Sequence, residues 1–184
     1  MTTRLLLTAM AVLLLGCLGP RTDLTRYFLL APATGPASAT TAPPIGLGPV
    51  TMPDYLDQTR IAALRGDQEI AFVPDARWAE RLGPMLRRSL AASLEGSAGR
   101  PVTAYPWRPD AAPAAIAAVD VTRFDVGPRS AMLRAEWQVR TGGTLRSGVA
   151  EIEEPARDTT VVERVAALNR SLARLSDQLA AALR

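Results

Sequence analysis

The clearest pattern along the chain is a strict alternation of apolar and polar residues between positions 131 and 140. One face is apolar and the other is polar or charged: Leu133, Ala135, Trp137 and Val139 against Arg134, Glu136, Gln138 and Arg140. Such alternation is typical of an antiparallel strand with one buried face. Gly142-Gly143 then predicts a turn into a second strand over 144–153. The alternation of that strand slips near Gly148, which predicts a bulge there.

Two segments show helical periodicity instead. Over 75–94 the apolar residues recur every three or four positions, and Pro84 inside this segment predicts a kink or a split. The strongest helix is expected near the C-terminus, where Thr160 and Glu163 have capping-box spacing and Asp158 is an alternative cap. An apolar stripe follows, made of Val161, Val165, Leu168, Leu172, Leu175, Leu179 and Leu183. The stripe is compatible with a coiled coil but favours one helix lying on a sheet.

Shorter apolar runs predict further strands. They cover 27–30, 45–50, 61–65, 69–73, 102–105 and 116–124, and Gly66-Asp67 predicts a hairpin between two of them. Segments rich in proline and small residues, at 32–44 and 106–113, predict loops. Several short strands and two helices, without strict alternation of the two, predict an α+β fold. We expect a single two-layer domain, with a mostly antiparallel sheet and two main helices packed on one face.

The N-terminal residues have the features of a bacterial lipoprotein signal. Arg4 precedes an apolar run over 5–15, which is too short to span a bilayer because a spanning helix needs about 20 residues. Leu14-Leu15-Gly16-Cys17 resembles a lipobox, in which the cysteine is acylated after cleavage. We therefore predict a signal peptide at 1–16, a tether lipidated at Cys17 over 17–26, and a periplasmic domain at 27–184. An ordinary signal peptide or membrane anchor is the alternative.

Two neighbouring observations refine this prediction. Leu18 follows the cysteine where an inner-membrane retention signal would usually place aspartate, so the predicted location is the periplasmic face of the outer membrane. Cys17 is also the only cysteine of the chain. Once it is lipidated no disulfide is possible, and the core must be stabilised by packing.

Composition narrows the classes of function. The net charge is +3, there is no histidine, and every basic residue is an arginine. The arginines are scattered rather than gathered into a patch, which argues against nucleic-acid binding. Without histidine there is no Ser-His-Asp triad, and with the cysteine lipidated there is no cysteine or histidine zinc site. The phosphate-binding and dinucleotide motifs are also missing. We expect a protein that is not an enzyme and uses no cofactor or metal.

One catalytic alternative remains, a cell-wall hydrolase with paired carboxylates. The candidate residues are Asp54 with Asp57, or Glu151, Glu153 and Glu154. The simpler interpretation is that these are solvated surface acids.

The segment 45–57 is the most distinctive part of the chain. Its glycines permit close backbone approach, and Met52-Pro53 favours an extended or turn geometry. Tyr55 and Leu56 follow this turn, where they either cover the core or contact a partner or lipid. The candidate partner-binding residues are Pro53, Asp54, Tyr55, Leu56 and Asp57.

Several motifs resemble the auxiliary lipoproteins of ABC-type lipid transport systems, the PqiC-like family. The matching pieces are Tyr27-Phe28-Leu29-Leu30, Gly-Leu-Gly-Pro-Val and Pro-Asp-Tyr-Leu-Asp within 46–57, Arg77-Trp78-Ala79-Glu80 with Leu82, Pro106-Trp107, the strand 121–124 and Ala135-Glu136-Trp137. One departure follows Asp57, where the family tends to have a basic residue and a proline and this chain has Gln58-Thr59-Arg60.

The resemblance implies a non-catalytic periplasmic component that works beside an inner-membrane ABC permease and ATPase complex and an MCE-domain protein. Such systems move phospholipid or other hydrophobic molecules between membranes and help maintain envelope integrity. The chain would then be a membrane-tethered adaptor, and whether it forms a homo-oligomer is left open. The alternative is a periplasmic lipoprotein that itself binds and carries a hydrophobic ligand.

Overall fold

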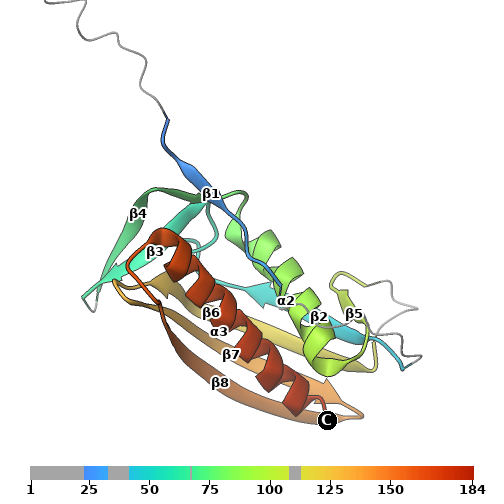
Figure 1. Ribbon diagram of the computed structural model, residues 1–184. Coiled ribbons are helices and arrows are strands. Elements are labelled where there is room, and N and C mark those ends of the chain that lie inside the picture. Colours follow the sequence, from blue (N-terminus) through green and yellow to red (C-terminus); the bar gives the residue numbers. More distant parts are fainter. Residues whose placement is uncertain (1–22, 33–41, 67, 108–112) are drawn as a thin grey trace, which may run out of the picture.

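The structure is a computed structural model that describes residues 23–32, 42–66, 68–107 and 113–184; the predicted signal peptide and Cys17 lie outside these ranges. The main sheet has five strands (Figure 1). Their order is β5 (Val102–Ala104), β2 (Ile45–Thr51), β6 (Ala115–Val126), β7 (Ser130–Thr141) and β8 (Thr144–Pro155). Strand β2 runs parallel to both of its neighbours, whereas β6, β7 and β8 form an antiparallel meander.

The alternating segment is confirmed as β7, and Gly142 and Gly143 turn the chain into β8 with positive φ angles of 56° and 85°. The bulge predicted near Gly148 is wrong, because β7 and β8 pair over their whole length without a register shift. Gly148 lies opposite Trp137, and a Cβ on Gly148 would come within 2.5 Å of the indole Cζ2. The glycine therefore makes room for the tryptophan. The alternation is also lost at the start of β8, because its first four residues are exposed on both faces.

A second, three-stranded sheet is an element that the sequence pattern does not predict. Its order is β1 (Arg26–Phe28), β4 (Glu69–Trp78) and β3 (Arg60–Arg65). Strands β3 and β4 form the predicted hairpin, in which Gly66 has a φ of +59°. Strand β1 is parallel to β4, so the N-terminal end of the domain is an edge strand.

Helix α2 (Leu82–Ala98) differs from the helix predicted over 75–94. Strand β4 continues through Trp78, and Ala76 and Trp78 are both buried, which is the period of two of a strand. Trp78 matches helical spacing only by coincidence, because it reaches the core from a strand. The predicted kink is also wrong. Pro84 lies in the first turn of α2, where its missing N–H breaks no helical hydrogen bond.

Helix α3 (Val161–Ala182) confirms the C-terminal prediction. The Thr160 hydroxyl accepts a hydrogen bond from the Glu163 amide at 3.3 Å, as the capping-box spacing indicated. Most of the apolar stripe is buried, namely Val165, Leu168, Leu172, Leu175, Leu179 and Leu183. Helix α3 contacts β6, β7 and β8, so the stripe is the face of a helix lying on a sheet.

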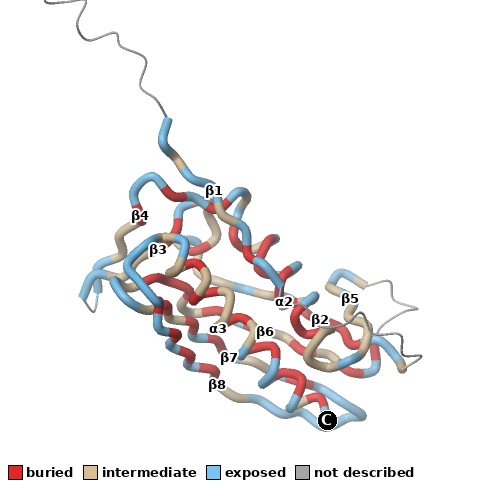
Figure 2. The backbone as a smooth tube through the Cα atoms, viewed as in Figure 1, coloured by how far each residue is buried: buried red, intermediate tan, exposed pale blue. Residues whose placement is uncertain are grey.

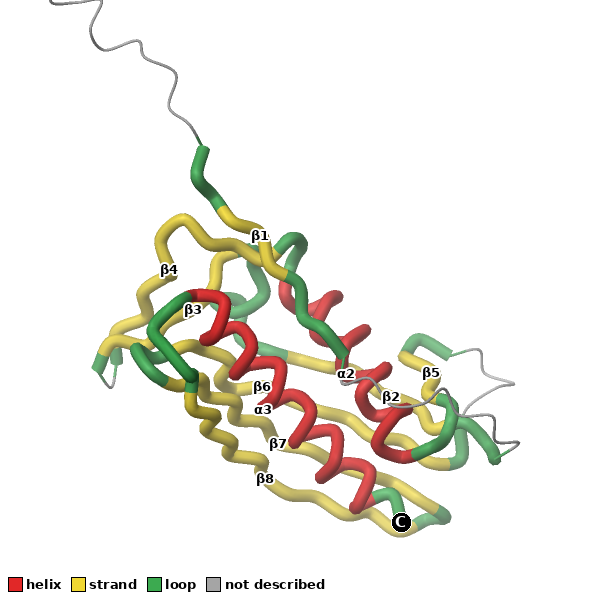
Figure 3. The backbone as a smooth tube through the Cα atoms, viewed as in Figure 1, coloured by secondary structure: helices red, strands yellow, loops and turns green. Residues whose placement is uncertain are grey.

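Both helices cover the same face of the main sheet and pack against each other (Figures 1 and 3). The predicted α+β class with two helices on one face is confirmed, and the main sheet is mixed. Buried residues concentrate between the helices and the sheet (Figure 2). Within the described part of the chain, no helix has both the length and the apolar character needed to cross a membrane.

One aromatic contact joins the two sheets. Trp78 at the end of β4 lies 6.3 Å, centroid to centroid, from Phe124 of β6, and both side chains are at most 2% exposed. Strand β3 also contacts β6. The small sheet is therefore fixed to the large one through a shared core, and the turn at 53–57 lies between β2 and β3, where the two sheets are connected.

Candidate partner-binding surface

The predicted partner segment forms a tight turn. The Pro53 carbonyl accepts hydrogen bonds from the amides of Leu56, at 2.9 Å, and Asp57, at 3.3 Å. Leu56 is 1% exposed and belongs to the core, whereas Asp54 is exposed at the tip of the turn. Of the five candidate residues, Leu56 is thus a core residue, and Asp54 is the one that is exposed to solvent.

Asp57 caps helix α2 from outside the helix. Its Oδ1 accepts a hydrogen bond from the Gly83 amide at 2.9 Å, and its Oδ2 forms an ion pair with Arg81. Arg81 occupies the N-cap position and makes no capping hydrogen bond of its own, so Asp57 satisfies one of the amides left free at the helix start. A Cβ at Gly83 would lie 2.9 Å from the Asp57 carboxylate, which explains the glycine.

Replacing Asp57 by alanine is expected to lower the free energy of unfolding by about 1–2 kcal/mol, the usual cost of losing a helix cap. The Arg81 guanidinium is largely exposed, so the ion pair adds little to this loss. Urea denaturation measures the effect. Asp57→Asn is the matched control, because its amide oxygen can still accept from Gly83, and it should cost less. Equal stabilities for wild type and Asp57→Ala would contradict the assigned cap.

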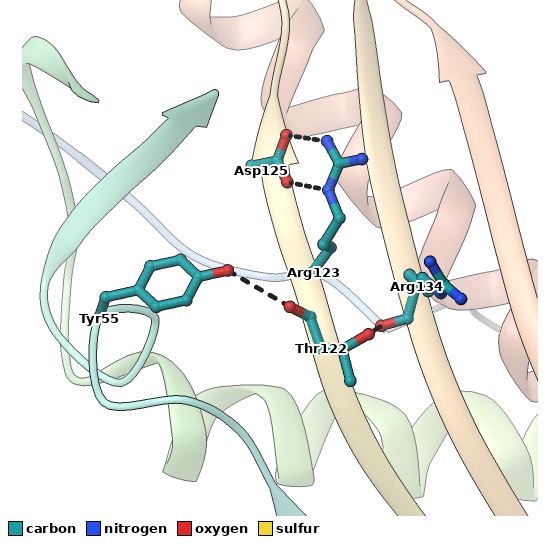
Figure 4. Close-up of polar contacts among 5 residues, drawn as sticks. All are labelled: Tyr55, Thr122, Arg123, Asp125 and Arg134. Carbon is teal, nitrogen blue, oxygen red and sulfur yellow. Dashed lines mark hydrogen bonds and ion pairs between the residues drawn. The ribbon is translucent and has the colours of Figure 1, made fainter. Parts of the chain in front are cut away.

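Tyr55 fastens the turn to the main sheet. Its hydroxyl donates to the Thr122 carbonyl at 3.3 Å (Figure 4). The register of β6 and β7 shifts between Val121 and Arg123, so Thr122 lies at an irregularity outside the regular ladder. Burial raises the pKa of the Tyr55 phenol, and the charge of nearby Asp125 adds to this effect. The hydroxyl therefore stays protonated and remains a donor.

An ion pair lies beside this hydroxyl. The Arg123 guanidinium donates two hydrogen bonds of 3.0 Å each to Asp125, whose side chain is 4% exposed (Figure 4). These bonds raise the pKa of the Arg123 guanidinium. Two parallel hydrogen bonds between an arginine and a carboxylate fix the relative geometry of both side chains. The pair therefore stabilises the end of β6.

The other carboxylates proposed for hydrolysis do not converge on one site. Glu154 is buried on the helix side of β8 and forms ion pairs with Arg170 and Arg174 of α3, at 3.4 and 2.6 Å. Glu151 and Glu153 are exposed on the opposite face of the same strand, as the alternation of a strand requires. Glu154 thus ties α3 to the edge of the sheet. In the described residues, no group of three or more acidic, cysteine or histidine side chains could hold a metal ion.

A hollow of about 460 Å³ lies on the face of the main sheet that the helices leave open. Its lining includes Thr51, Asp120, Glu136, Gln138, Ser147 and Val149. Asp120 and Glu136 are register partners on β6 and β7, and the Thr51 hydroxyl donates to Asp120 at 2.5 Å. Ligand pockets for apolar molecules are lined mainly by apolar side chains. Pro49, Ala118, Val119, Trp137 and Val149 add apolar surface beside these polar groups, so the lining is mixed rather than mainly apolar.

Sequence reasoning missed the features that hold the turn in place. The Asp57 cap and the Tyr55 hydrogen bond join the turn to residues on other elements, and the Arg123–Asp125 pair lies within β6 beside the Tyr55 hydroxyl. One local signal was available. Arg81 is a poor N-cap residue, so the start of α2 required an acceptor from elsewhere in the chain.

Two solved structures share this fold. A crystal structure of an uncharacterized protein aligns with a TM-score of 0.73 and 22% sequence identity, over 87% of this chain and 99% of the other. The crystal structure of protein XCC0632 from Xanthomonas campestris aligns with a TM-score of 0.71 and 17% identity, over 86% of this chain and 95% of the other. No protein of curated function matches the sequence.

A family model identifies the chain more specifically. The model of the ABC-type transport auxiliary lipoprotein component matches residues 27–180. The match begins in β1 and ends in α3, so it includes both sheets, both helices and the turn at 53–57. The chain therefore belongs to the family of ABC-type transport auxiliary lipoprotein components.

Proposed function

We propose that the protein is a non-catalytic lipoprotein that is anchored through Cys17 to the periplasmic face of the outer membrane. There it serves as an adaptor in an MCE-type intermembrane lipid transport system. Its partners are an MCE-domain protein and the associated ABC permease and ATPase, and its role is to help maintain the envelope. The observation that supports this most strongly is the family match over nearly the whole folded part of the chain.

The positions of the anchor and the turn suit an adaptor. The first strand, β1, begins at Arg26, shortly after Cys17, so the tether would hold a compact domain close to the membrane. Confinement of both partners to the same envelope raises their effective concentration, so that modest contacts suffice for binding. The turn at 53–57 would offer such a contact, because Asp57 and Tyr55 hold it in one conformation while Asp54 is exposed.

The packing favours an adaptor over a carrier of hydrophobic ligand. Leucines that are completely buried fill the space between the helices and the sheet, including Leu86, Leu90, Leu133, Leu168 and Leu172. A carrier would need an apolar cavity there, and the hollow on the open face of the sheet has a mixed polar and apolar lining instead. The geometry therefore favours a protein that acts by binding a partner at the membrane over one that carries a ligand in its interior.

Reversing the charge of Asp54 tests the proposed contact. Asp54→Arg is expected to reduce the amount of MCE-domain protein that co-purifies with the full-length lipoprotein about tenfold, which corresponds to about 1.4 kcal/mol. Its unfolding midpoint should match that of the wild type, because Asp54 is exposed. Quantitative immunoblotting of the co-purified partner measures the loss.

Glu153→Arg is the matched control, since it reverses an exposed acidic charge on β8, two strands away from the strand β6 that Tyr55 contacts. It should retain the partner at the wild-type level. If Asp54→Arg also retained it, the turn would not be the contact surface, whatever the role of the anchor.

A further inference from the structure

Three large apolar side chains are exposed along the stretch through which the chain enters the domain. Leu24, Tyr27 and Leu29 are 71%, 62% and 62% exposed, whereas Leu30, which follows them, is 5% exposed and packs in the core. This stretch is exposed where β1 leaves the body of the molecule (Figure 2). Large exposed apolar side chains gathered on one short segment mark a contact with a protein or a membrane. We call these three residues the apolar patch.

Two residues of the patch, Tyr27 and Leu29, belong to the rigid body of the domain. Strand β1 pairs with β4, and the Phe28 carbonyl accepts from the Ala79 amide at 2.9 Å. The Leu30 carbonyl then accepts from the Ser89 hydroxyl of α2 at 3.0 Å. These bonds fix Tyr27 and Leu29 relative to the helices. Whatever the patch contacts therefore also orients the whole domain.

The length of the tether determines what the patch can reach. Seven residue steps separate Cys17 from Leu24 (24 − 17 = 7), and an extended chain spans at most about 3.6 Å per residue. The patch thus lies within about 25 Å of an acyl anchor on Cys17. Because the acyl chains on Cys17 would lie in the bilayer, the bilayer is always within this distance of the patch.

The chemistry of the patch suits the headgroup level of a bilayer. Tyrosine is enriched there, because its ring is apolar and its hydroxyl is polar, and leucine adds apolar area. The charges around it are balanced, since Arg26 and Arg77 are accompanied by Asp23 and Asp75. Apolar insertion, rather than attraction to anionic lipid, is therefore the expected mode of contact.

We infer that Leu24, Tyr27 and Leu29 insert into the headgroup region of the leaflet that holds the Cys17 anchor, so that the domain is docked on the membrane in a fixed orientation. This inference rests on the proposed anchoring at Cys17. The hairpin between β7 and β8 lies at the opposite end of the molecule from β1 in Figure 1 and points away from the bilayer in this orientation.

An environment-sensitive fluorophore tests the docking. In the acylated full-length protein Cys17 carries no free thiol, so a cysteine introduced by Leu24→Cys or Leu29→Cys is the only site for the label. The controls are Leu145→Cys and Val149→Cys on β8, where the wild-type side chains are 56% and 57% exposed. The labelled proteins are reconstituted into vesicles of phosphatidylethanolamine and phosphatidylglycerol, and emission and quenching by iodide are recorded.

We expect a blue shift and protection from iodide at positions 24 and 29, and aqueous emission at 145 and 149. Aqueous emission at all four positions, in protein that floats with the vesicles, would overturn the docking and leave the anchor intact. A blue shift at all four would overturn the fixed orientation. Protein that is not acylated and does not float would refute the proposed anchor, and the docking with it.

Discussion

Cys17→Ala is expected to abolish palmitate incorporation and to move the protein from the outer-membrane fraction to the soluble periplasmic fraction. Each buried methylene of an acyl chain contributes about 0.8 kcal/mol to membrane binding, so several chains on one cysteine hold the protein far more firmly than any contact of a folded surface. With the anchor gone, the effective concentration at the partner falls and envelope-barrier function should be lost. Radiolabelled palmitate, fractionation and detergent sensitivity measure the three effects.

Leu18→Asp separates acylation from location. It leaves Cys17 intact but places aspartate where a retention signal has it, so this variant should incorporate palmitate and remain in the inner membrane. Full complementation by the soluble Cys17→Ala protein would contradict a role for the tether.

Trp78→Ala is expected to lower the free energy of unfolding by about 3–5 kcal/mol, the usual cost of removing a large buried aromatic side chain. Trp78 is 1% exposed and packs against Phe124, so the cavity would open at the junction of the two sheets. A loss of this size is a large fraction of the stability of a small domain. Urea denaturation followed by circular dichroism measures it.

Trp137→Phe is the control for altering an indole at another place. Trp137 is only partly buried, and its indole nitrogen has no hydrogen-bond partner in the described structure. Its replacement should therefore cost less than about 1.5 kcal/mol. A loss below about 1 kcal/mol for Trp78→Ala would show that the two sheets do not depend on this contact.

The two helices show how far the sequence predicts the fold. Helix α3 follows from local signals alone, since Thr160 caps it and its stripe is continuous over its length. Helix α2 does not, because Trp78 fits both the helical spacing and the alternation of β4. Tertiary pairing makes this segment a strand, because β4 continues to pair with β1 up to Trp78. Within that strand, Asp75 has a φ of +51°.

The candidate surface was predictable in position but not in detail. The segment 53–57 stood out for its proline, tyrosine and turn residues, and it does form a turn. Leu56 packs in the core, and Asp57 caps helix α2, which begins at Leu82, 25 residues later (82 − 57 = 25), through contacts with Arg81 and Gly83. A sequence pattern contains no distances between elements, so it cannot distinguish a carboxylate that caps a helix from one that is exposed to solvent.

Native mass spectrometry of the wild-type protein, gently extracted from membranes, tests the proposed adaptor most directly. We expect a mature chain that starts at an acylated Cys17, remains bound to an MCE-domain protein and retains no further hydrophobic ligand. A chain that keeps its first sixteen residues and an unmodified thiol, or a solitary protein with a lipid in its fold, would contradict the adaptor.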